Sequence, residues 1–395
     1  MNIKKYVAFL AISVAVFTLV GTVVAQEYNK KDLQKRVIAH SQEEVNKAIA
    51  LGCQVVRTTK TLKALVCPES AAQSLSLAED VRVFALEDEN TDALRGPDVN
   101  AASASANQQI GATIVHNNGN TGSGRKVVVL DTGYNYTHPE LASSYLGGRD
   151  FVNNDLDPMD DEGHGSHVAG IITADGINSN AKGVAPNAGV ISGKVLDNVG
   201  SGYFSDVVAA IYWAVDGADG VYGTIDDFGA DAISLSLGTG SPYLYKGFCD
   251  GVMPDLTNAI KYAVGKNVTV VVAAGNSGNA GVSIPGCISY STTVGAVGSS
   301  DKVASFSGRG NALDIMAPGV SIYSTVLGNS YASWSGTSMA TPMITGVVAL
   351  MKNAHPTYTQ LQVENKLFST AKDLGRAGKD KDYGWGRVRA DLAAQ

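Results

Sequence analysis

Continuous apolar runs alternate with helical runs along the last three quarters of the chain, and this alternation constrains the fold most strongly. The apolar runs are KVVVLD, GVISGKVL, ADAISLSLG and VTVVVAAGN, and helical segments such as SDVVAAIYWAVD and MPDLTNAIKYAVGK lie between them. Continuous apolar strands are typical of parallel sheets that are buried on both faces. Residues 109–395 are therefore predicted to form an α/β domain, a doubly wound and mainly parallel sheet with helices on both faces.

Residues 1–25 have the pattern of a secretory signal peptide. The basic MNIKK precedes the apolar run YVAFLAISVAVFTLVGTVVA, which ends in small residues at Ala25. The apolar run is also long enough to span a bilayer, so an uncleaved anchor is the alternative. We expect a secreted chain that has no membrane contact after signal cleavage.

Residues 26–94 are predicted to form a small separate domain. The apparent order of elements is β-α-β-β-α-β, a ferredoxin-like α+β plan, with VRVFALE as its last strand. Ser41 and Glu44 form the pattern of a capping box at the first helix. The small, polar and aperiodic residues that follow indicate a linker over 95–108.

Charge and cysteine content narrow the class of protein further. The net charge is -7 and the folded part holds no cluster of Lys or Arg, so no nucleic-acid partner is expected. Four cysteines in an exported chain suggest disulfides, with three possible connectivities. Cys53 and Cys67 flank a predicted hairpin, which brings them near each other.

Three stretches carry residues suited to nucleophilic catalysis. VVVLDTG ends a predicted strand in Asp131, GHGSHVAG opens a helix near His164, and SGTSMATP opens another helix near Ser338. A serine hydroxyl needs a base to take its proton, and the base needs a carboxylate that orients it. Each residue alone has an ordinary structural explanation, so only the combination is informative.

The order of these motifs, together with FSGRGNALDIMAPG and YGWGRV, resembles the subtilisin-like serine proteases, or subtilases, over residues 109–393. The resemblance implies that Asp131 orients the base, His164 is the general base and Ser338 is the nucleophile. It also implies that Asn276 in AAGN contributes its side chain to the oxyanion hole. The implied activity is that of a serine endopeptidase that works through an acyl-enzyme.

The resemblance further implies a cleft for extended polypeptides. SLSLG and VGSGYF correspond to the two backbone edges between which a substrate lies as an added strand. The expected substrate-binding residues are Ser236, Leu237, Gly238, Gly200, Ser201, Gly202 and Ser283.

Calcium is the one cofactor expected. The loop DFVNNDLDPMDDEG carries many oxygen ligands, a composition that suits Ca²⁺, and some subtilases hold calcium at this position. A solvated acidic loop is the alternative. A second acidic loop starts at Asp216, and ADGINSNAKG matches a third family loop, although Ile177 and Glu140 depart from its usual ligands. The expected ligands in the first loop are Asp150, Asn153, Asp155, Asp157 and Asp160.

The small domain resembles the inhibitor-type propeptide of the family, which assists folding and blocks the cleft. A tail of about seven residues after Glu87 predicts self-cleavage near Leu94. A disulfide between the domains would tether the inhibitor, so Cys53–Cys67 and Cys249–Cys287 is the preferred pairing. The expected product is a monomeric enzyme with its own propeptide as intramolecular inhibitor.

Two other functions fit the sequence less well. A lipase or esterase of the α/β-hydrolase type has the order Ser, Asp, His and a G-x-S-x-G elbow, whereas Ala340 stands here in place of the second glycine. A non-catalytic peptide-binding relative usually lacks a triad residue, and none is missing. His167 has no third ligand for a zinc site, and both His167 and His138 are predicted to be structural.

Overall fold

The computed structural model describes residues 34–86 and 103–395, which divide into two compact units with the boundary between Asp80 and Val81. The predicted signal peptide and the predicted cleavage position near Leu94 lie outside the described residues. Among the described residues, none of the helices has the length and apolar character needed to cross a bilayer.

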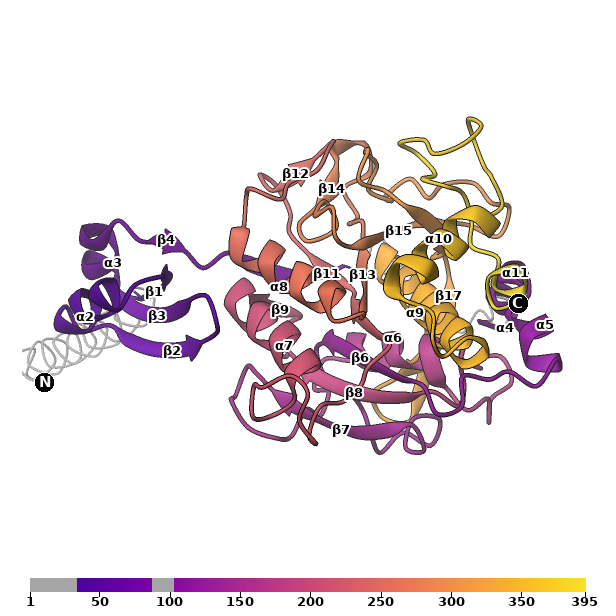
Figure 1. The fold of residues 1–395 in the computed structure, drawn as a ribbon, viewed down its shortest axis with the longest axis horizontal. Coiled ribbons are helices and arrows are strands. Elements are labelled where there is room, and N and C mark those ends of the chain that lie inside the picture. Colours follow the sequence, from indigo (N-terminus) through magenta and orange to yellow (C-terminus); the bar gives the residue numbers. More distant parts are fainter. Residues whose placement is uncertain (1–33, 87–102) are drawn as a thin grey trace, which may run out of the picture. The chain divides into compact units, whose positions relative to one another are not determined.

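The first unit is a four-stranded antiparallel sheet with two helices (Figure 1). The predicted β-α-β-β-α-β order is found, and the capping box of Ser41 and Glu44 is confirmed at α2. The disulfide Cys53–Cys67 links the residues just before β2 and inside β3, as the hairpin predicted. Its elements are β1 (Gln34–Ala39), α2 (Gln42–Ala50), β2 (Gln54–Thr58), β3 (Lys63–Pro68), α3 (Glu69–Leu75) and β4 (Ala78–Glu79), with the strand order β2-β3-β1-β4.

The last strand of this unit differs from the prediction. The two-residue strand β4 takes the fourth place beside β1, and the segment VRVFALE pairs in the second unit instead. The prediction was wrong because strand propensity is local and does not specify which sheet edge a strand will join.

The second unit is built on a seven-stranded sheet in which every neighbouring pair is parallel, so the predicted fold class is confirmed. The order of strands is β16-β15-β13-β10-β6-β8-β7. The chain builds first on one side of β6 and then on the other, which makes the carboxyl end of β6 the topological switch point. The strands are β6 (Lys126–Asp131), β7 (Tyr145–Asp150), β8 (Gly189–Lys194), β10 (Ala232–Leu235), β13 (Thr269–Ala273), β15 (Thr292–Val297) and β16 (Ile315–Pro318).

Helices cover both faces of this sheet. Helices α6 (His164–Thr173) and α9 (Thr337–Ala354) pack against each other and share a buried core with Val127 and Val129 of β6. Helices α7 (Phe204–Asp216) and α8 (Pro254–Gly265) pack together and contact β6 and β13 respectively (Figure 1). The unit also contains α4 (Ser103–Ile110), α5 (Ala112–Asn117), α10 (Gln360–Thr370) and α11 (Ala390–Ala393).

Helix α4 begins inside the predicted linker. Asn107 is buried and its Nδ2 atom donates to the carbonyl oxygen of Lys182 at 2.8 Å. Because the segment is poor in large apolar residues, its sequence did not indicate a packed helix. Ala106 and Ile110 nevertheless are buried in the core of the second unit, so apolar contacts fix the helix together with this hydrogen bond.

Three small sheets complete the second unit. The strand β5 (Arg82–Ala85) lies between β11 (Leu237–Gly238) and β9 (Ser201–Tyr203). The other two pairs are β12 (Leu244–Tyr245) with β14 (Val282–Ser283), and β17 (Ile322–Val326) with β18 (Ser330–Trp334). The disulfide Cys249–Cys287 lies beside the pair β12 and β14, and completes the expected pairing.

Candidate active site

Asp131 ends β6 at the switch point of the sheet, and its side chain is fully buried. Its Oδ1 atom accepts a hydrogen bond from the backbone N–H of Thr132 at 2.7 Å. The Nδ1 atom of His164 lies 2.7 Å from the same oxygen. A carboxylate that accepts from Nδ1–H leaves Nε2 as the nitrogen that can take up a proton. The structure thus brings these two predicted residues into the arrangement that orients a general base.

Glycines allow the start of α6 to approach β6. Gly163 has a φ of 115°, in the left-handed region that favours glycine. A Cβ atom on Gly165 would collide with the backbone of Gly133, two residues after Asp131. The GHG motif is therefore needed to place His164 against the end of the strand.

Ser338 is the second residue of α9 and is fully buried. Its Oγ atom donates to the carbonyl oxygen of Ser236 at 2.9 Å, and Ser236 Oγ donates to the carbonyl oxygen of Ser338 at 3.0 Å. Four residues earlier, the indole ring of Trp334 is stacked with the ring of His164, with 6.4 Å between centroids. Ser338 therefore lies four residues after Trp334, whose ring packs against His164.

Asn276 follows β13, and its side-chain amide is held in one orientation. Its Oδ1 atom accepts from Thr337 N at 3.0 Å and from Thr337 Oγ1 at 2.9 Å. The Nδ2 atom then donates to the carbonyl oxygen of Leu86 at 2.8 Å. The expected oxyanion-hole side chain is thus bonded to a peptide carbonyl.

Strand β5 occupies the place predicted for a bound polypeptide. It pairs antiparallel with β11 on one side and with β9 on the other, and Ala85 N donates to the carbonyl oxygen of Gly200 at 2.8 Å. Val83 is fully buried, whereas Phe84 is 44% exposed. Six of the predicted substrate-binding residues therefore line β5 or the side chain that follows it, namely Leu237, Gly238, Gly200, Ser201, Gly202 and Ser283. The seventh, Ser236, bonds to Ser338 instead.

The side chain of Leu86 lies against a pocket without side-chain bulk. A Cβ atom built on Gly238 would lie 3.0 Å from Cδ1 of Leu86 and 2.5 Å from Oγ of Ser283. A Cβ atom on Gly275 would also lie 2.6 Å from that oxygen. The side chain of Leu86 therefore lies beside Gly238 and near Ser283, and the missing side chain of Gly238 leaves room for it.

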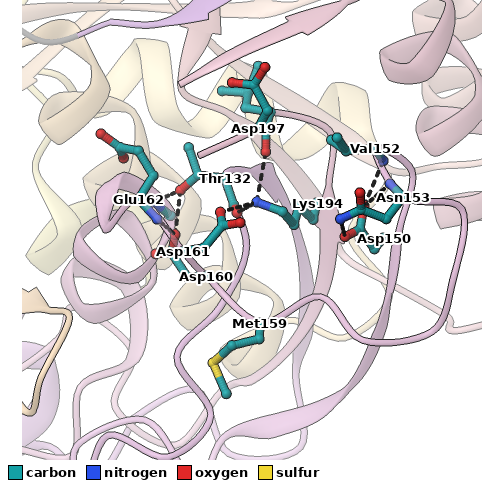
Figure 2. Close-up of polar contacts among 12 residues, drawn as sticks. Thr132, Asp150, Val152, Asn153, Met159, Asp160, Asp161, Glu162, Lys194 and Asp197 are labelled. Carbon is teal, nitrogen blue, oxygen red and sulfur yellow. Dashed lines mark hydrogen bonds and ion pairs between the residues drawn. The ribbon is translucent and has the colours of Figure 1, made fainter. Parts of the chain in front are cut away.

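In the acidic loop before His164, the carboxylates predicted to bind calcium accept hydrogen bonds from the protein itself. The carboxylate of Asp150 accepts from the N–H groups of Val152 and Asn153 and from Asn153 Nδ2, at 2.6 to 2.9 Å (Figure 2). Asn153 thus turns its nitrogen, not its oxygen, toward Asp150. Over residues 34–86 and 103–395 no group of three or more His, Cys, Asp or Glu side chains is arranged to hold a metal.

The remaining predicted ligands also serve as hydrogen-bond acceptors. Asp160 is buried, and its two oxygens accept from the hydroxyls and N–H groups of Thr132, Glu162, Gly163 and Ser166. Asp155 accepts from Asp157 N, and Asp157 accepts from Met159 N and from the hydroxyl of Tyr136. These carboxylates bind donors of the loop itself and also side chains of the flanking segments.

The two other acidic loops follow the same rule. Asp226 accepts hydrogen bonds from Thr224 Oγ1 and from two loop N–H groups. These hydrogen bonds lower the pKa of its carboxyl, and the bond from Thr224 has the largest effect. The buried Glu140 accepts from the N–H groups of residues 176–178 and from the hydroxyl of Tyr331. In both loops a carboxylate holds consecutive backbone amides.

His167 is structural, as predicted, but its neighbours were not foreseen. Its ring is stacked on Trp334 with 4.5 Å between centroids, and Nε2 lies 3.1 Å from the carbonyl oxygen of Ala332. Burial lowers the pKa of His167 to about 3, so the ring is neutral beside the active site. The only sequence signals were an aromatic residue close to the serine motif and a second histidine one helical turn after His164.

Comparison with known proteins agrees with this geometry. The model of the subtilase family matches residues 122–386. The chain is 40% identical to subtilisin E of Bacillus subtilis (strain 168) over 294 residues, which cover 73% of this chain and 70% of the relative. It is also 40% identical to subtilisin of Bacillus pumilus, of which 97% is covered, and to an alkaline protease of Alkalihalobacillus alcalophilus, of which 68% is covered. With a match over most of its second unit, the chain belongs to the subtilase family of serine endopeptidases.

Proposed function

We propose that this protein is the secreted zymogen of a serine endopeptidase, and that it activates itself by cleaving the Leu86–Glu87 peptide bond. The observation that carries this proposal is the hydrogen bond from Asn276 Nδ2 to the carbonyl oxygen of Leu86. This carbonyl directly follows a strand that is paired on both sides, and an N–H donor 2.8 Å from such an oxygen is the kind of contact that stabilises an oxyanion during attack.

The catalytic roles follow from the chemistry of the three side chains. Ser338 Oγ leaves its hydrogen bond to the carbonyl of Ser236 and gives its proton to His164 as it attacks the carbonyl carbon of the substrate. Asp131 stabilises the imidazolium that forms. His164 gives the proton to the departing amine, and water then hydrolyses the acyl-enzyme with His164 again as base.

The proposed cleavage position is eight residues before the one expected from the sequence. The expectation near Leu94 assumed that VRVFALE ends the small domain and that a tail follows it. Because Arg82–Ala85 itself is the strand between β9 and β11, the chain reaches the oxyanion donor at Leu86. Residues 26–86 are then the propeptide, and the mature enzyme starts at Glu87.

Inhibition by the propeptide follows from the same pairing. While β5 lies between β9 and β11, no other polypeptide can pair with either edge there. The first unit directly precedes β5 in the chain, and the two together are proposed to form the inhibitory propeptide. Secretion is proposed from the signal-peptide pattern of residues 1–25, and the mature enzyme is proposed to be a monomer that acts on extended polypeptides.

Expression of the wild type beside Ser338→Ala tests the proposal. We expect the wild type to release a fragment whose carboxyl-terminal residue is Leu86, as measured by mass spectrometry, and to digest casein. Ser338→Ala should stay full length and inert, and a fluorophosphonate should label wild type at Ser338 only. Ser330→Ala, a change at an exposed serine on β18, is the control and should behave as wild type.

Two results would contradict the proposal separately. A released fragment that ends near Leu94 would contradict cleavage after Leu86 but would not contradict the proposed endopeptidase activity. A Ser338→Ala variant that still digests casein would reject the catalytic assignment itself.

A further inference from the structure

Lys194 is a buried lysine at the carboxyl end of β8, and the catalytic steps above do not use it. Lys194 is only 1% exposed. This is unusual because burial of an ammonium costs free energy unless the group is paired and hydrogen-bonded. Nζ donates to the carbonyl oxygens of Thr132 and Leu196, at 2.6 and 3.0 Å, and to Asp161 Oδ1 at 2.6 Å. The three N–H bonds of the ammonium therefore meet three acceptors.

The first acceptor belongs to the segment that holds the catalytic carboxylate. Thr132 donates its backbone N–H to Asp131 Oδ1, and its Oγ1 atom accepts from the N–H of Gly165, next to His164. Thr132 Oγ1 also donates to the buried Asp160. Lys194 thus restrains the residue through which the segments of Asp131 and His164 are joined.

The other two acceptors lie on the segments to either side. Asp161 is three residues before His164, and Figure 2 shows Lys194 reaching toward Thr132 and Asp161 while Asp150 bonds within its own loop. Leu196 forms a bridge with Gly202, which is paired with Val83 of the strand in the cleft. One ammonium therefore connects the two catalytic segments with an edge of the substrate cleft.

We propose that Lys194 is a positioning residue for proteolysis: its ammonium fixes the Asp131 segment, the His164 loop and the β9 edge relative to one another. The assignment rests on the proposed catalytic roles of Asp131 and His164. Lys194 touches neither the substrate strand nor the reacting atoms in any contact described here, so it acts through Thr132, Asp161 and Leu196.

The test replaces Lys194 by Met, which keeps an unbranched apolar stem but removes all three donors. Loss of the bond to Thr132 should lower kcat about tenfold or more for every substrate, because small displacements of catalytic groups are costly. Loss of the bond to Leu196 should raise KM only for tetrapeptide anilides that pair with β9, and not for a single-residue ester. The variants are matured with a trace of wild-type enzyme, which is then removed, so that slow self-processing does not affect the kinetics.

Lys352→Met is the matched control. Lys352 is also a buried lysine, 6% exposed, and its Nζ donates to the carbonyl oxygen of Tyr358, but it lies at the far end of α9, 14 residues after Ser338. This control should lose thermal stability and keep the kcat and KM of wild type. A role of Lys194 in stability alone would make the two variants behave alike, and that result would overturn the proposal.

Two milder variants apply if Lys194→Met does not fold. Lys194→Gln keeps two N–H donors and should recover part of kcat. Asp161→Ala removes one arm at a side chain that is 49% exposed, and should lower kcat a few-fold with KM unchanged. Wild-type kcat and KM in both Lys194→Gln and Asp161→Ala would overturn the proposal. If the catalytic assignment itself is wrong, Ser338→Ala will be active, which is a separate result.

Discussion

The side-chain amide of Asn276 spans two segments, since Oδ1 accepts from Thr337 and Nδ2 donates to the carbonyl oxygen of Leu86. Asn276→Leu removes the donor and keeps a similar volume. We expect kcat to fall by about 10²–10³, the range known for removal of one oxyanion-hole donor in subtilisin, with little change in KM because the lost bond acts on the transition state. Steady-state kinetics with a peptide anilide measure this, and a rise in KM at constant kcat would contradict the role in the oxyanion hole.

Gly238→Ala should narrow the pocket that holds the side chain of Leu86. The new Cβ atom would lie 3.0 Å from Leu86 Cδ1, so kcat/KM should fall about tenfold or more for leucine before the cleaved bond and much less for alanine. Gly240→Ala is the control, because a Cβ atom there meets nothing within 4 Å. Equal losses for the two substrates would show that Leu86 does not mark the specificity pocket.

His167 should make the folded protein less stable in acid. Its folded pKa of about 3 lies below the ordinary value, so the unfolded chain binds the proton more readily between these values, and stability falls as pH falls through that window. His167→Phe keeps a ring on Trp334 and should flatten the pH dependence of the free energy of unfolding by up to about 1.4 kcal/mol per pH unit.

Urea titrations at several pH values from 7 to 4, in a Ser338→Ala background that prevents self-digestion, measure this difference. His116 and His138, whose pKa values burial also lowers, are present in both proteins and cancel in the comparison. Parallel slopes for the two proteins would contradict the prediction.

Asp160→Ala should destabilise the protein whether or not calcium is present. The carboxylate holds Thr132 and Ser166 as well as two N–H groups of its own loop, and removal of a buried acceptor of this kind costs about 3 kcal/mol or more. Thermal melts of Ser338→Ala and of Ser338→Ala with Asp160→Ala, in calcium and in chelator, measure the loss. A loss that appears only in calcium would show that the loop binds the ion after all.

The sequence predicted those parts of the structure that depend on local pattern or chain order. Continuous apolar strands predicted a parallel sheet, and the motif VVVLDTG correctly placed Asp131 at the end of one of its strands. The hairpin between Cys53 and Cys67 fixed their proximity, because few residues separate the two strands. In these cases neighbouring residues decide the outcome.

The missed features depend on contacts between distant segments. Strand propensity identified Arg82–Ala85 as extended, but its partners are more than 100 residues away in β9 and β11. The carboxylates of the acidic loop accept hydrogen bonds from its own amides and from the hydroxyls of Thr132, Tyr136 and Ser166, contacts that its composition did not indicate. Lys194 is the single charged residue of the apolar run GVISGKVL, but the sequence did not indicate its three hydrogen-bond acceptors, because only the fold brings them together.

Strand β5 has hydrogen-bonding partners on both sides, and its departure leaves β9 and β11 each with an open row of main-chain donors and acceptors. Bare strand edges adhere to other extended chains and favour aggregation. Such an edge forms hydrogen bonds with the peptide main chain, which all unfolded polypeptides share. In the proposed zymogen, β5 therefore also protects these two edges from pairing with other chains, and the edges exposed by the proposed cleavage are suited to bind unfolded polypeptides of almost any sequence.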